Sequence, residues 1–254
     1  MSISPVKSAV RVLEVFDYFR RERRARQLKE ICEALNYPQS SGTALLKNLV
    51  TLGYLSYDRT TRNYFPTLKI AALGDWLEQA LFGQSQIFEV MRDLHSASGE
   101  AVSVALQNDV YMQYIHVIQS IHPLRFHTEE GSMRPLTLSA TGWVLMSAHP
   151  DREVDRLIRR ANIATQPVAD RQPMDLMMQR VREARAAGHA YAENLPLLGG
   201  ATLCVMLPLK VQGRSVVLGM GGALERIRPR RQEYLQLMQD LVSSLNESAS
   251  IPEA

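Results

Sequence analysis

The sequence predicts an α+β protein, with a small helical module first and a larger domain around an antiparallel sheet second. Apolar residues recur at helical spacing in three short runs before residue 53. Later strand-like runs come in pairs joined by tight turns, and helical runs lie between and after those pairs. Strands in hairpins with segregated helices are typical of an antiparallel sheet flanked by helices.

Composition places the chain among globular proteins. Of its 254 residues, 46% are hydrophobic and 22% charged, which suits one or two domains with a buried core. It shows neither a signal-peptide pattern nor an apolar run of about 18 residues, so we expect a cytoplasmic protein with no membrane partner. Cys32 and Cys204 are too isolated for a disulfide framework or a zinc site, and we expect both to be buried.

The first three helices are predicted from apolar spacing and from the residues that end them. The apolar positions of the first are Val6, Val10, Leu13, Phe16 and Phe19, and we expect it to end before the basic run at residues 20–24. The second covers residues 28–35 and ends before Pro38, because proline disfavours helical geometry in the preceding residue. The third ends at Gly53, a typical cap, and its buried face is expected to hold Gly42, Leu45, Leu46, Leu49 and Leu52.

The opposite face of the third helix carries small polar groups. Ser40, Thr43, Ala44 and Lys47 share it, and Gln39 stands at the helix start. A helix that enters the major groove of DNA, which is about 12 Å wide, needs short donors and acceptors near its N-terminus. A helix that serves stability alone usually carries paired charges instead. We therefore expect this helix to read double-stranded DNA.

A β-hairpin follows the third helix. Leu55 and Tyr57 lie on its first strand, a polar turn at residues 58–63 carries Arg59 and Arg62, and residues 64–65 return. A hairpin directly after a helix-turn-helix is a wing, whose cations can reach phosphates beside the helix. Residues 1–75 also hold 12 Lys and Arg against 7 Asp and Glu, which suits a phosphate-binding module.

We thus predict a winged helix-turn-helix over residues 1–67, a linker helix over 68–84 and a second domain over 85–254. The linker helix is predicted from the stripe Ile70, Leu73, Leu77 and Leu81, which needs a partner in the second domain or another subunit. In the second domain, hairpins are expected at residues 101–117 and 202–221. Its clearest helices are expected at residues 87–94, 139–147, 152–161, 174–187 and 229–246.

The sequence gives little support for a metal, cofactor or catalytic site. His116, His122 and His127 lie within a dozen residues, but their spacing fits no compact metal-ligand motif. The glycine-rich run at residues 219–222 is followed by no helix and no suitably placed acidic residue, so we expect no nucleotide cofactor. No Ser, Cys or Lys stands in a recognisable nucleophile setting, and we do not expect an enzyme.

These residues together resemble the IclR family of bacterial transcriptional regulators. In the first module the resemblance rests on residues 8–13 (SAVRVL), 28–31 (LKEI), 38–41 (PQSS), 46–49, 53–55 (GYL) and Tyr64. In the second domain it rests on residues 134–136 (RPL), 139–142 (SATG), 188–193 (GHAYAE) and 205–209 (VMLPL). The resemblance covers nearly the whole chain and is most specific in the first module.

The resemblance implies a winged helix-turn-helix joined by a linker helix to a GAF-like effector-binding domain. Such a protein acts as a homodimer or homotetramer whose affinity for operator DNA changes when a small organic effector binds, often an organic acid or an aromatic compound. Matched by position, the effector site would contain Thr137, Ala140, Thr141, Trp143, Glu193, Thr202, Gly219 and Gly221. The DNA contacts expected from the module are Gln39, Ser40, Ser41, Thr43, Lys47, Arg59 and Arg62.

The sequence departs from the family pattern in informative places. Ala44 stands where the family usually has Arg. The base or phosphate contact of that Arg would therefore have to come from another residue, such as Lys47. Trp143 replaces a frequent Lys, and Gly219 and Gly221 replace residues with hydroxyl groups. These changes remove polar groups and add space and an aromatic wall. A bulkier, partly apolar ligand therefore suits the sequence as well as a small carboxylate does.

A second function stays open, in which a small-molecule sensor or enzyme uses the basic N-terminal module for assembly. An assembly module would carry large apolar groups where Ser40, Thr43 and Lys47 stand, so these residues favour the regulator. In the mechanism that we expect, the recognition helices of a dimer enter successive major grooves roughly 34 Å apart. An effector that prefers one arrangement of the domains then shifts operator affinity.

Overall fold

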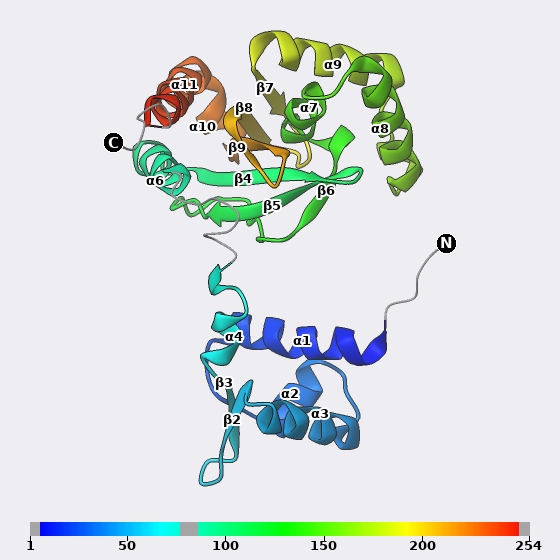
Figure 1. Cartoon of the computed structure of the whole chain (residues 1–254), viewed down its shortest axis with the longest axis vertical. Coiled ribbons are helices and arrows are strands. Elements are labelled where there is room, and N and C mark those ends of the chain that lie inside the picture. Colours follow the sequence, from blue (N-terminus) through cyan, green and yellow to red (C-terminus); the bar gives the residue numbers. More distant parts are fainter. Residues whose placement is uncertain (1–5, 77–85, 249–254) are drawn as a thin grey trace. The chain divides into compact units, whose positions relative to one another are not determined.

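The computed structural model describes residues 6–76 and 86–248, and the chain divides into two compact units, Met1–Gly83 and Gln84–Ala254 (Figure 1). Each unit has a core of its own. In the described parts of the chain, no helix is both long enough and apolar enough to cross a membrane.

The first unit begins with a three-helix module and a small sheet. Its helices are α1 (Lys7–Glu22), α2 (Leu28–Ala34) and α3 (Gln39–Thr51). Its strands β1 (Arg26–Gln27), β2 (Leu55–Asp58) and β3 (Asn63–Pro66) form an antiparallel sheet in the order β1-β3-β2. The core is made by Val15, Tyr18, Phe19, Ile31, Leu46, Leu49, Leu55 and Tyr64. The predicted helices, turn and hairpin are therefore present, and β1 is an addition.

Local signals explain most of the helix ends. Helix α3 begins directly after Pro38, and Gly53 follows it with φ +77, donating its N–H to the carbonyl of Val50 over 2.9 Å. Helix α1, however, continues to Glu22 rather than ending before residue 20. Arg20 and Arg21 lie in its last turn, where the helix dipole favours cations.

The face of α3 that packs against the module is narrower than predicted. Gly42, Leu46 and Leu49 are buried, but Leu52 is 56% exposed because it lies past the last helical residue. Gly42 faces Cys32 of α2 so closely that a Cβ at this position would lie 2.3 Å from the Cys32 sulfur. The absence of a side chain at residue 42 therefore sets how closely α2 and α3 pack.

The segment predicted as a linker helix is described only in its first part. Helix α4 (Lys69–Ala72) is followed by a turn at residues 73–74, after which residues 75–76 are again helical. Residues 77–84 of the predicted helix, with Leu77 and Leu81, lie outside the described residues.

The second unit is built on a six-stranded antiparallel sheet, in the order β6-β5-β4-β9-β8-β7. The predicted hairpins are β4 (Ala101–Asn108) with β5 (Tyr111–Ile118), and β8 (Gly200–Val211) with β9 (Arg214–Ala223). The edge strands β6 (Met133–Pro135) and β7 (His189–Glu193) were not predicted. Both edge strands contribute residues to the sites described below.

Helices cover the sheet on both sides. Helix α7 (Ala140–Ser147) packs against β7, β8 and β9, and α8 (Asp151–Ala164) and α9 (Met174–Ala187) pack around it, so residues 140–146 are all buried. A Cβ on Gly142 would lie 2.1 Å from the Leu136 carbonyl oxygen, so α7 sits directly on the chain before it. Helices α6 (Ile87–Ser98) and α11 (Arg231–Ser248) pack together and against β4 and β8 (Figure 1).

Short helical segments complete the second unit. They are η1 (Leu136–Leu138), η2 (Val168–Asp170), α10 (Leu224–Ile227) and η3 (Arg228–Arg230). The four helices predicted at residues 139–147, 152–161, 174–187 and 229–246 correspond to α7, α8, α9 and α11, and α6 is the predicted opening helix of the unit.

Candidate functional site

The outer face of α3 carries the polar side chains that the sequence placed there. Gln39, Ser40, Ala44 and Lys47 are exposed, and Ser41 and Thr43 are half-buried. The Thr43 hydroxyl donates a hydrogen bond to the Gln39 carbonyl over 2.7 Å, which leaves both of its lone pairs free to accept. The largest of these side chains is a lysine, so this face of α3 can approach a DNA groove closely.

The β2–β3 hairpin projects from the module beside α3 (Figure 1). The Asp58 carboxylate fixes its turn by accepting hydrogen bonds from the Thr60 N–H and the Thr61 hydroxyl, each over 2.8 Å. These bonds, the one from Thr61 first, lower the pKa of Asp58 below its usual range. Arg59 and Arg62 flank this turn and are exposed.

The cations of the first unit fall into two groups. Arg26 is held by Glu22 and Glu30, and Arg20 lies 3.8 Å from Asp17. Across residues 6–76 and 86–248, by contrast, no acidic side chain pairs with Lys47, Arg59 or Arg62. Their charges are therefore available to phosphate groups.

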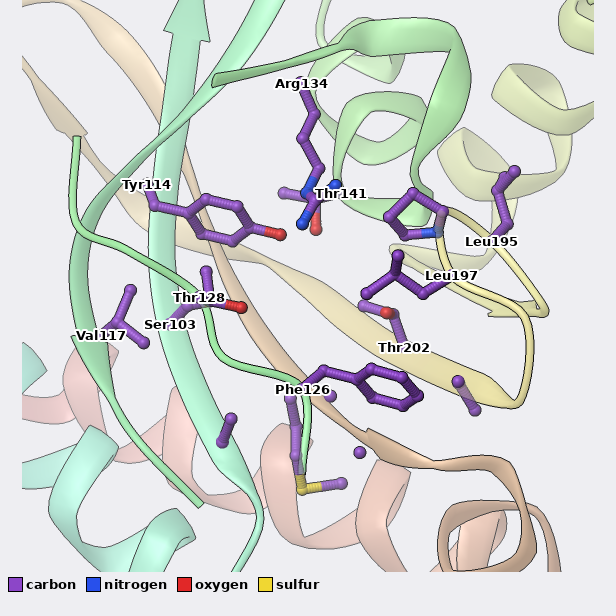
Figure 2. A pocket seen from close by; sticks show the side chains of 17 residues that line it. Ser103, Tyr114, Val117, Phe126, Thr128, Arg134, Thr141, Leu195, Leu197 and Thr202 are labelled. Carbon is purple, nitrogen blue, oxygen red and sulfur yellow. The ribbon is translucent and has the colours of Figure 1, made fainter. Parts of the chain in front are cut away.

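A cavity opens at one end of the large sheet, on the side of α7. The empty space in it, including the space open to solvent at its mouth, measures about 580 Å³. Its polar lining comes from five elements and one connecting segment: Ser103, Tyr114, Thr128, Arg134, Thr141 and Thr202. Figure 2 shows Arg134 and Tyr114 pointing toward one another, with Thr141 beside them.

Arg134 is the charged group of this cavity. Its Nε atom is buried and has no hydrogen-bond partner, and no carboxylate pairs with its guanidinium in the parts of the chain that the structure describes. Burial raises the pKa of the adjacent Tyr114 hydroxyl, and the Arg134 charge opposes that shift. A buried donor without a partner costs about 1–3 kcal/mol, which a bound acceptor would recover.

The opposite wall of the cavity is apolar. Val117 comes from β5, and Phe126 comes from the segment that follows β5. Residues 195–197 come from the loop between β7 and β8 (Figure 2). Gln119 fixes the segment that carries Phe126, because its side chain donates to the Thr128 carbonyl over 2.6 Å and accepts from the Thr128 N–H over 3.4 Å.

A buried ion pair also fixes the segment that carries Phe126. Glu100 is fully buried and accepts two hydrogen bonds from Arg226, over 2.6 and 2.9 Å. Arg226 also donates to the Leu124 carbonyl over 3.1 Å, which ties the segment to α10. The wall of the cavity that bears Phe126 is therefore hydrogen-bonded at several points.

The eight residues proposed for the effector site lie in different places. Thr141, Thr202 and Gly221 line this cavity, and Trp143 and Glu193 line a separate groove on the other side of residue 195. Thr137, Ala140 and Gly219 are buried and line neither space, although a Cβ on Gly219 would lie 3.7 Å from the Thr141 hydroxyl. The structure thus brings three of the eight together.

Sequence reasoning did not select Arg134, Tyr114 or Phe126. Arg134 stands within residues 134–136, which carried the family resemblance, and that was its available signal. Tyr114 and Phe126 offered no signal of their own, because their role depends on pairing between strands far apart in the sequence.

The histidines and cysteines do not form a metal site within the described residues. Within the described ranges, no group of three His, Cys, Asp or Glu side chains could hold a metal ion. His116 pairs with Glu130 over 2.7 Å, whereas His122 lies 3.6 Å from Glu100. Burial raises the pKa of the Cys204 thiol to about 12, so this sulfur is protonated at neutral pH.

The first unit is a winged helix-turn-helix with an open polar face and unpaired cations. The second unit of the same chain holds a cavity lined by one arginine, several hydroxyl groups and an apolar wall. Together they define a ligand-responsive DNA-binding regulator. The model of the IclR helix-turn-helix domain matches residues 8–59, and the model of the bacterial transcriptional regulator IclR C-terminal domain matches residues 84–247. The chain belongs to the IclR family, and its C-terminal unit is the effector domain of a transcriptional regulator.

Individual relatives agree with this assignment. The HTH-type transcriptional regulator KdgR of Escherichia coli (strain K12) is 23% identical over 232 residues, which cover 89% of this chain and 88% of KdgR. The effector domain of an IclR regulator from Acinetobacter sp. ADP1 is 46% identical, with a TM-score of 0.63 over 66% of this chain and 98% of that one. The IclR structure from Thermotoga maritima, at 15% identity, shares the fold with a TM-score of 0.75 over 96% of this chain and 99% of its own.

Proposed function

We propose that the C-terminal domain binds an aromatic carboxylic acid and that this effector changes the affinity of the N-terminal module for operator DNA. The observation that carries the proposal is the buried, unpartnered Nε of Arg134 in the cavity. Guanidinium groups bind carboxylates through two parallel hydrogen bonds, which satisfies such a donor. Arg134 is thus the anchor for the acid group.

The neighbours of Arg134 fit a carboxylate. The Tyr114 hydroxyl and the Thr141 hydroxyl lie beside the guanidinium and can each donate to the same acid group (Figure 2). The raised pKa of Tyr114 keeps its hydroxyl protonated and therefore able to donate at neutral pH. These three groups act together at one end of the cavity.

The opposite end of the cavity fits an aromatic ring. Phe126, Val117 and Leu197 line it, and the ring of Phe126 offers an edge-to-face or offset contact. The glycine at residue 221 leaves room on the sheet where a larger side chain would stand. Size and apolar character at this end therefore favour a ring over a short aliphatic chain.

For DNA, we propose a division of roles between base and backbone contacts. Gln39, Ser40, Ser41 and Thr43 read base edges from the N-terminal half of α3. Lys47, Arg59 and Arg62 bind phosphates, as their exposure and lack of acidic partners support. Residues 68–84 connect this module to the effector domain, residues 85–254.

We also propose that the regulator acts as a homodimer. The first unit leaves large apolar side chains exposed, with Leu13 on α1 at 65% and Trp76 near the connecting segment at 63%. Exposed apolar groups of this size are typical of surfaces that a partner covers. A dimer also presents two recognition helices to successive major grooves.

The effector proposal is tested by calorimetric titration with benzoate, cyclohexanecarboxylate and benzamide. We expect benzoate to bind more tightly than cyclohexanecarboxylate, and benzamide to bind at least about tenfold more weakly, because a charged hydrogen bond is worth about 1.5–3 kcal/mol. Arg134→Met should lose benzoate binding, whereas Arg125→Met, which changes an exposed arginine outside the cavity, should not.

Gel-shift titrations of genomic operator fragments with and without benzoate complete the test. A change in apparent affinity that Arg134→Met abolishes supports the coupling of ligand and DNA. Equal binding of benzoate and benzamide, or unchanged benzoate binding by Arg134→Met, would overturn the assignment of Arg134.

A further inference from the structure

A second concave site lies in the effector domain, on the other side of residues 193–195. This groove measures about 910 Å³ including the space open to solvent. Its walls include Trp143 of α7, Arg180 of α9, Tyr191 and Glu193 of β7, and Arg231 at the start of α11. Leu195 lines both this groove and the effector cavity, and Arg134 lines only the cavity.

Two arginines in this groove are stacked on aromatic rings. The guanidinium carbon of Arg180 lies 5.2 Å from the centre of the Trp143 ring, and that of Arg231 lies 4.4 Å from the centre of the Tyr191 ring. A guanidinium whose carbon lies over a ring can keep the N–H groups at its edge available to a planar acceptor.

Neither arginine is paired with an acid in the described ranges of the chain. No carboxylate lies within salt-bridge distance of Arg180 or Arg231, and the Nε of Arg231 is buried without a hydrogen-bond partner. Many surface arginines of this domain, by contrast, are paired, such as Arg182 and Arg185 with Asp151. The groove thus holds two arginines whose charges no carboxylate of the described residues neutralises.

The acidic residue that lines the groove does not neutralise them. Glu193 is held by Arg228, whose Nε donates to it over 2.9 Å, and by the Tyr191 hydroxyl over 2.8 Å. Burial and this bond raise the pKa of Tyr191 to about 12, and Arg228 lowers the pKa of Glu193. Arg231 lowers the pKa of Glu193 through its charge alone, without a hydrogen bond. The charges of Arg228 and Glu193 thus neutralise one another, and the groove keeps the two positive charges of Arg180 and Arg231.

We propose that this groove is a second ligand site of the effector domain and that it binds a small aliphatic dicarboxylate. Each stacked guanidinium receives one carboxylate edge-on, and the buried Nε of Arg231 gains its missing acceptor. Leu176, Met177 and Leu195 supply apolar surface for the carbon chain between the two acid groups. The site is independent of the aromatic acid proposed for the cavity, because the two spaces have different cations.

Tryptophan fluorescence provides a direct test, because the chain has two tryptophans and Trp143 lies in the groove. In a Trp76→Phe background, Trp143 is the sole emitter. We expect succinate, glutarate or adipate to change its emission in a saturable way, and acetate and inorganic phosphate to do so much more weakly. Calorimetry with the same acids gives the stoichiometry.

Variants separate the groove from the cavity and from general charge effects. Arg180→Ala and Arg231→Ala should each weaken dicarboxylate binding by about tenfold or more, since each removes a charged hydrogen-bonding group. Arg182→Ala removes the same charge from the same helix but outside the groove, and it should bind as the parent does. Arg134→Met should also leave dicarboxylate binding intact while it abolishes benzoate binding.

Three outcomes would overturn the proposal: no saturable change with any of the dicarboxylates, equal weakening by Arg182→Ala and Arg180→Ala, and loss of dicarboxylate binding in Arg134→Met. The last would place the dicarboxylate in the effector cavity. Thermal melting of each variant verifies that folding is retained.

Discussion

Gly42 shows how a single residue sets the packing of the DNA-binding module. A Cβ there would lie 2.3 Å from the Cys32 sulfur, and the nearest atom of Leu28 would be 3.7 Å away. Gly42→Ala should therefore destabilise the first unit by about 1–3 kcal/mol, the usual cost of overpacking. Chemical denaturation of the wild type and the variant measures this difference.

The obstacle at residue 42 is one atom, which makes a compensating change possible. Cys32→Ala removes the sulfur, so the double variant with Gly42→Ala should recover stability relative to Gly42→Ala alone. Asn48→Ala, on the exposed side of the same helix, is the control and should change stability little. A Gly42→Ala protein as stable as the wild type would contradict the close contact.

Cys204 makes stability fall at alkaline pH. Burial raises the pKa of its thiol to about 12, while the unfolded thiol titrates near its ordinary value of 9.0. Above pH 9 the unfolded state loses this proton and the folded state keeps it, so folding becomes less favourable as pH rises toward 12. From pH 8 to 10 this thiol alone should lower the unfolding free energy by about 1 kcal/mol.

The measurement compares urea unfolding at pH 8 and 10 for the wild type and Cys204→Ala. The variant is less stable at both pH values because it leaves a cavity. Its loss of unfolding free energy between pH 8 and pH 10, however, should be smaller than that of the wild type by the contribution of this thiol. An identical loss in both proteins would show that Cys204 does not titrate as described.

At the scale of elements, we expect helix α3 and the β2–β3 wing to act as one DNA-binding surface. Lys47→Ala, Arg59→Ala and Arg62→Ala should each weaken binding to all DNA sequences and reduce the salt dependence by about one unit of slope. Arg159→Ala, which removes a cation paired with Asp155 in the effector domain, is the matched control. Fluorescence anisotropy with one duplex at several salt concentrations measures the slope.

Direct readout of base edges by α3 leads to a different prediction. Gln39→Ala and Thr43→Ala should change which sequences are preferred in a selection from random duplexes, with a smaller effect on the salt slope. Unchanged preference in both variants would contradict direct readout from this face, and unchanged affinity in the three cation variants would contradict the wing and helix contacts.

Elements with clear end signals could be predicted from the sequence closely. Pro38 and Gly53 bound α3, and Gly188, with φ +71, ends α9. The short strands β1, β6 and β7 could not, because two to five residues carry too little periodicity and their pairing depends on distant strands. The end of α1 was misjudged because a run of arginines reads as a loop although it also suits a last helical turn.

The ligand site was less predictable than the fold. Thr141, Thr202 and Gly221 could be placed by family position, and they line the cavity. The cavity also depends on Arg134 and Phe126, which are brought together by an edge strand and an irregular segment. No local pattern indicates which side chains such a segment directs inward, so tertiary structure is needed to find them.

At the scale of the whole molecule, the exposed apolar side chains of the first unit predict self-association. The regulator should elute as a dimer in size-exclusion chromatography with light scattering. Leu13→Glu should shift it toward the monomer and weaken operator binding, because a charge in an apolar contact is unfavourable. Leu198→Glu, at a leucine of the effector domain that is 87% exposed, is the control. A dimer that persists in Leu13→Glu would exclude α1 from the interface.

The segment that carries Phe126 has a consequence for selectivity. Its hydrogen bonds to Gln119 and Arg226 form when the domain folds, so the entropy of ordering this wall is lost before any ligand arrives. A ligand that matches the cavity therefore binds without that cost. We expect an acid with a larger ring than the one proposed above to enter only at the cost of these hydrogen bonds. The stiffness of one short segment would then set an upper limit on the size of the signal that the regulator accepts.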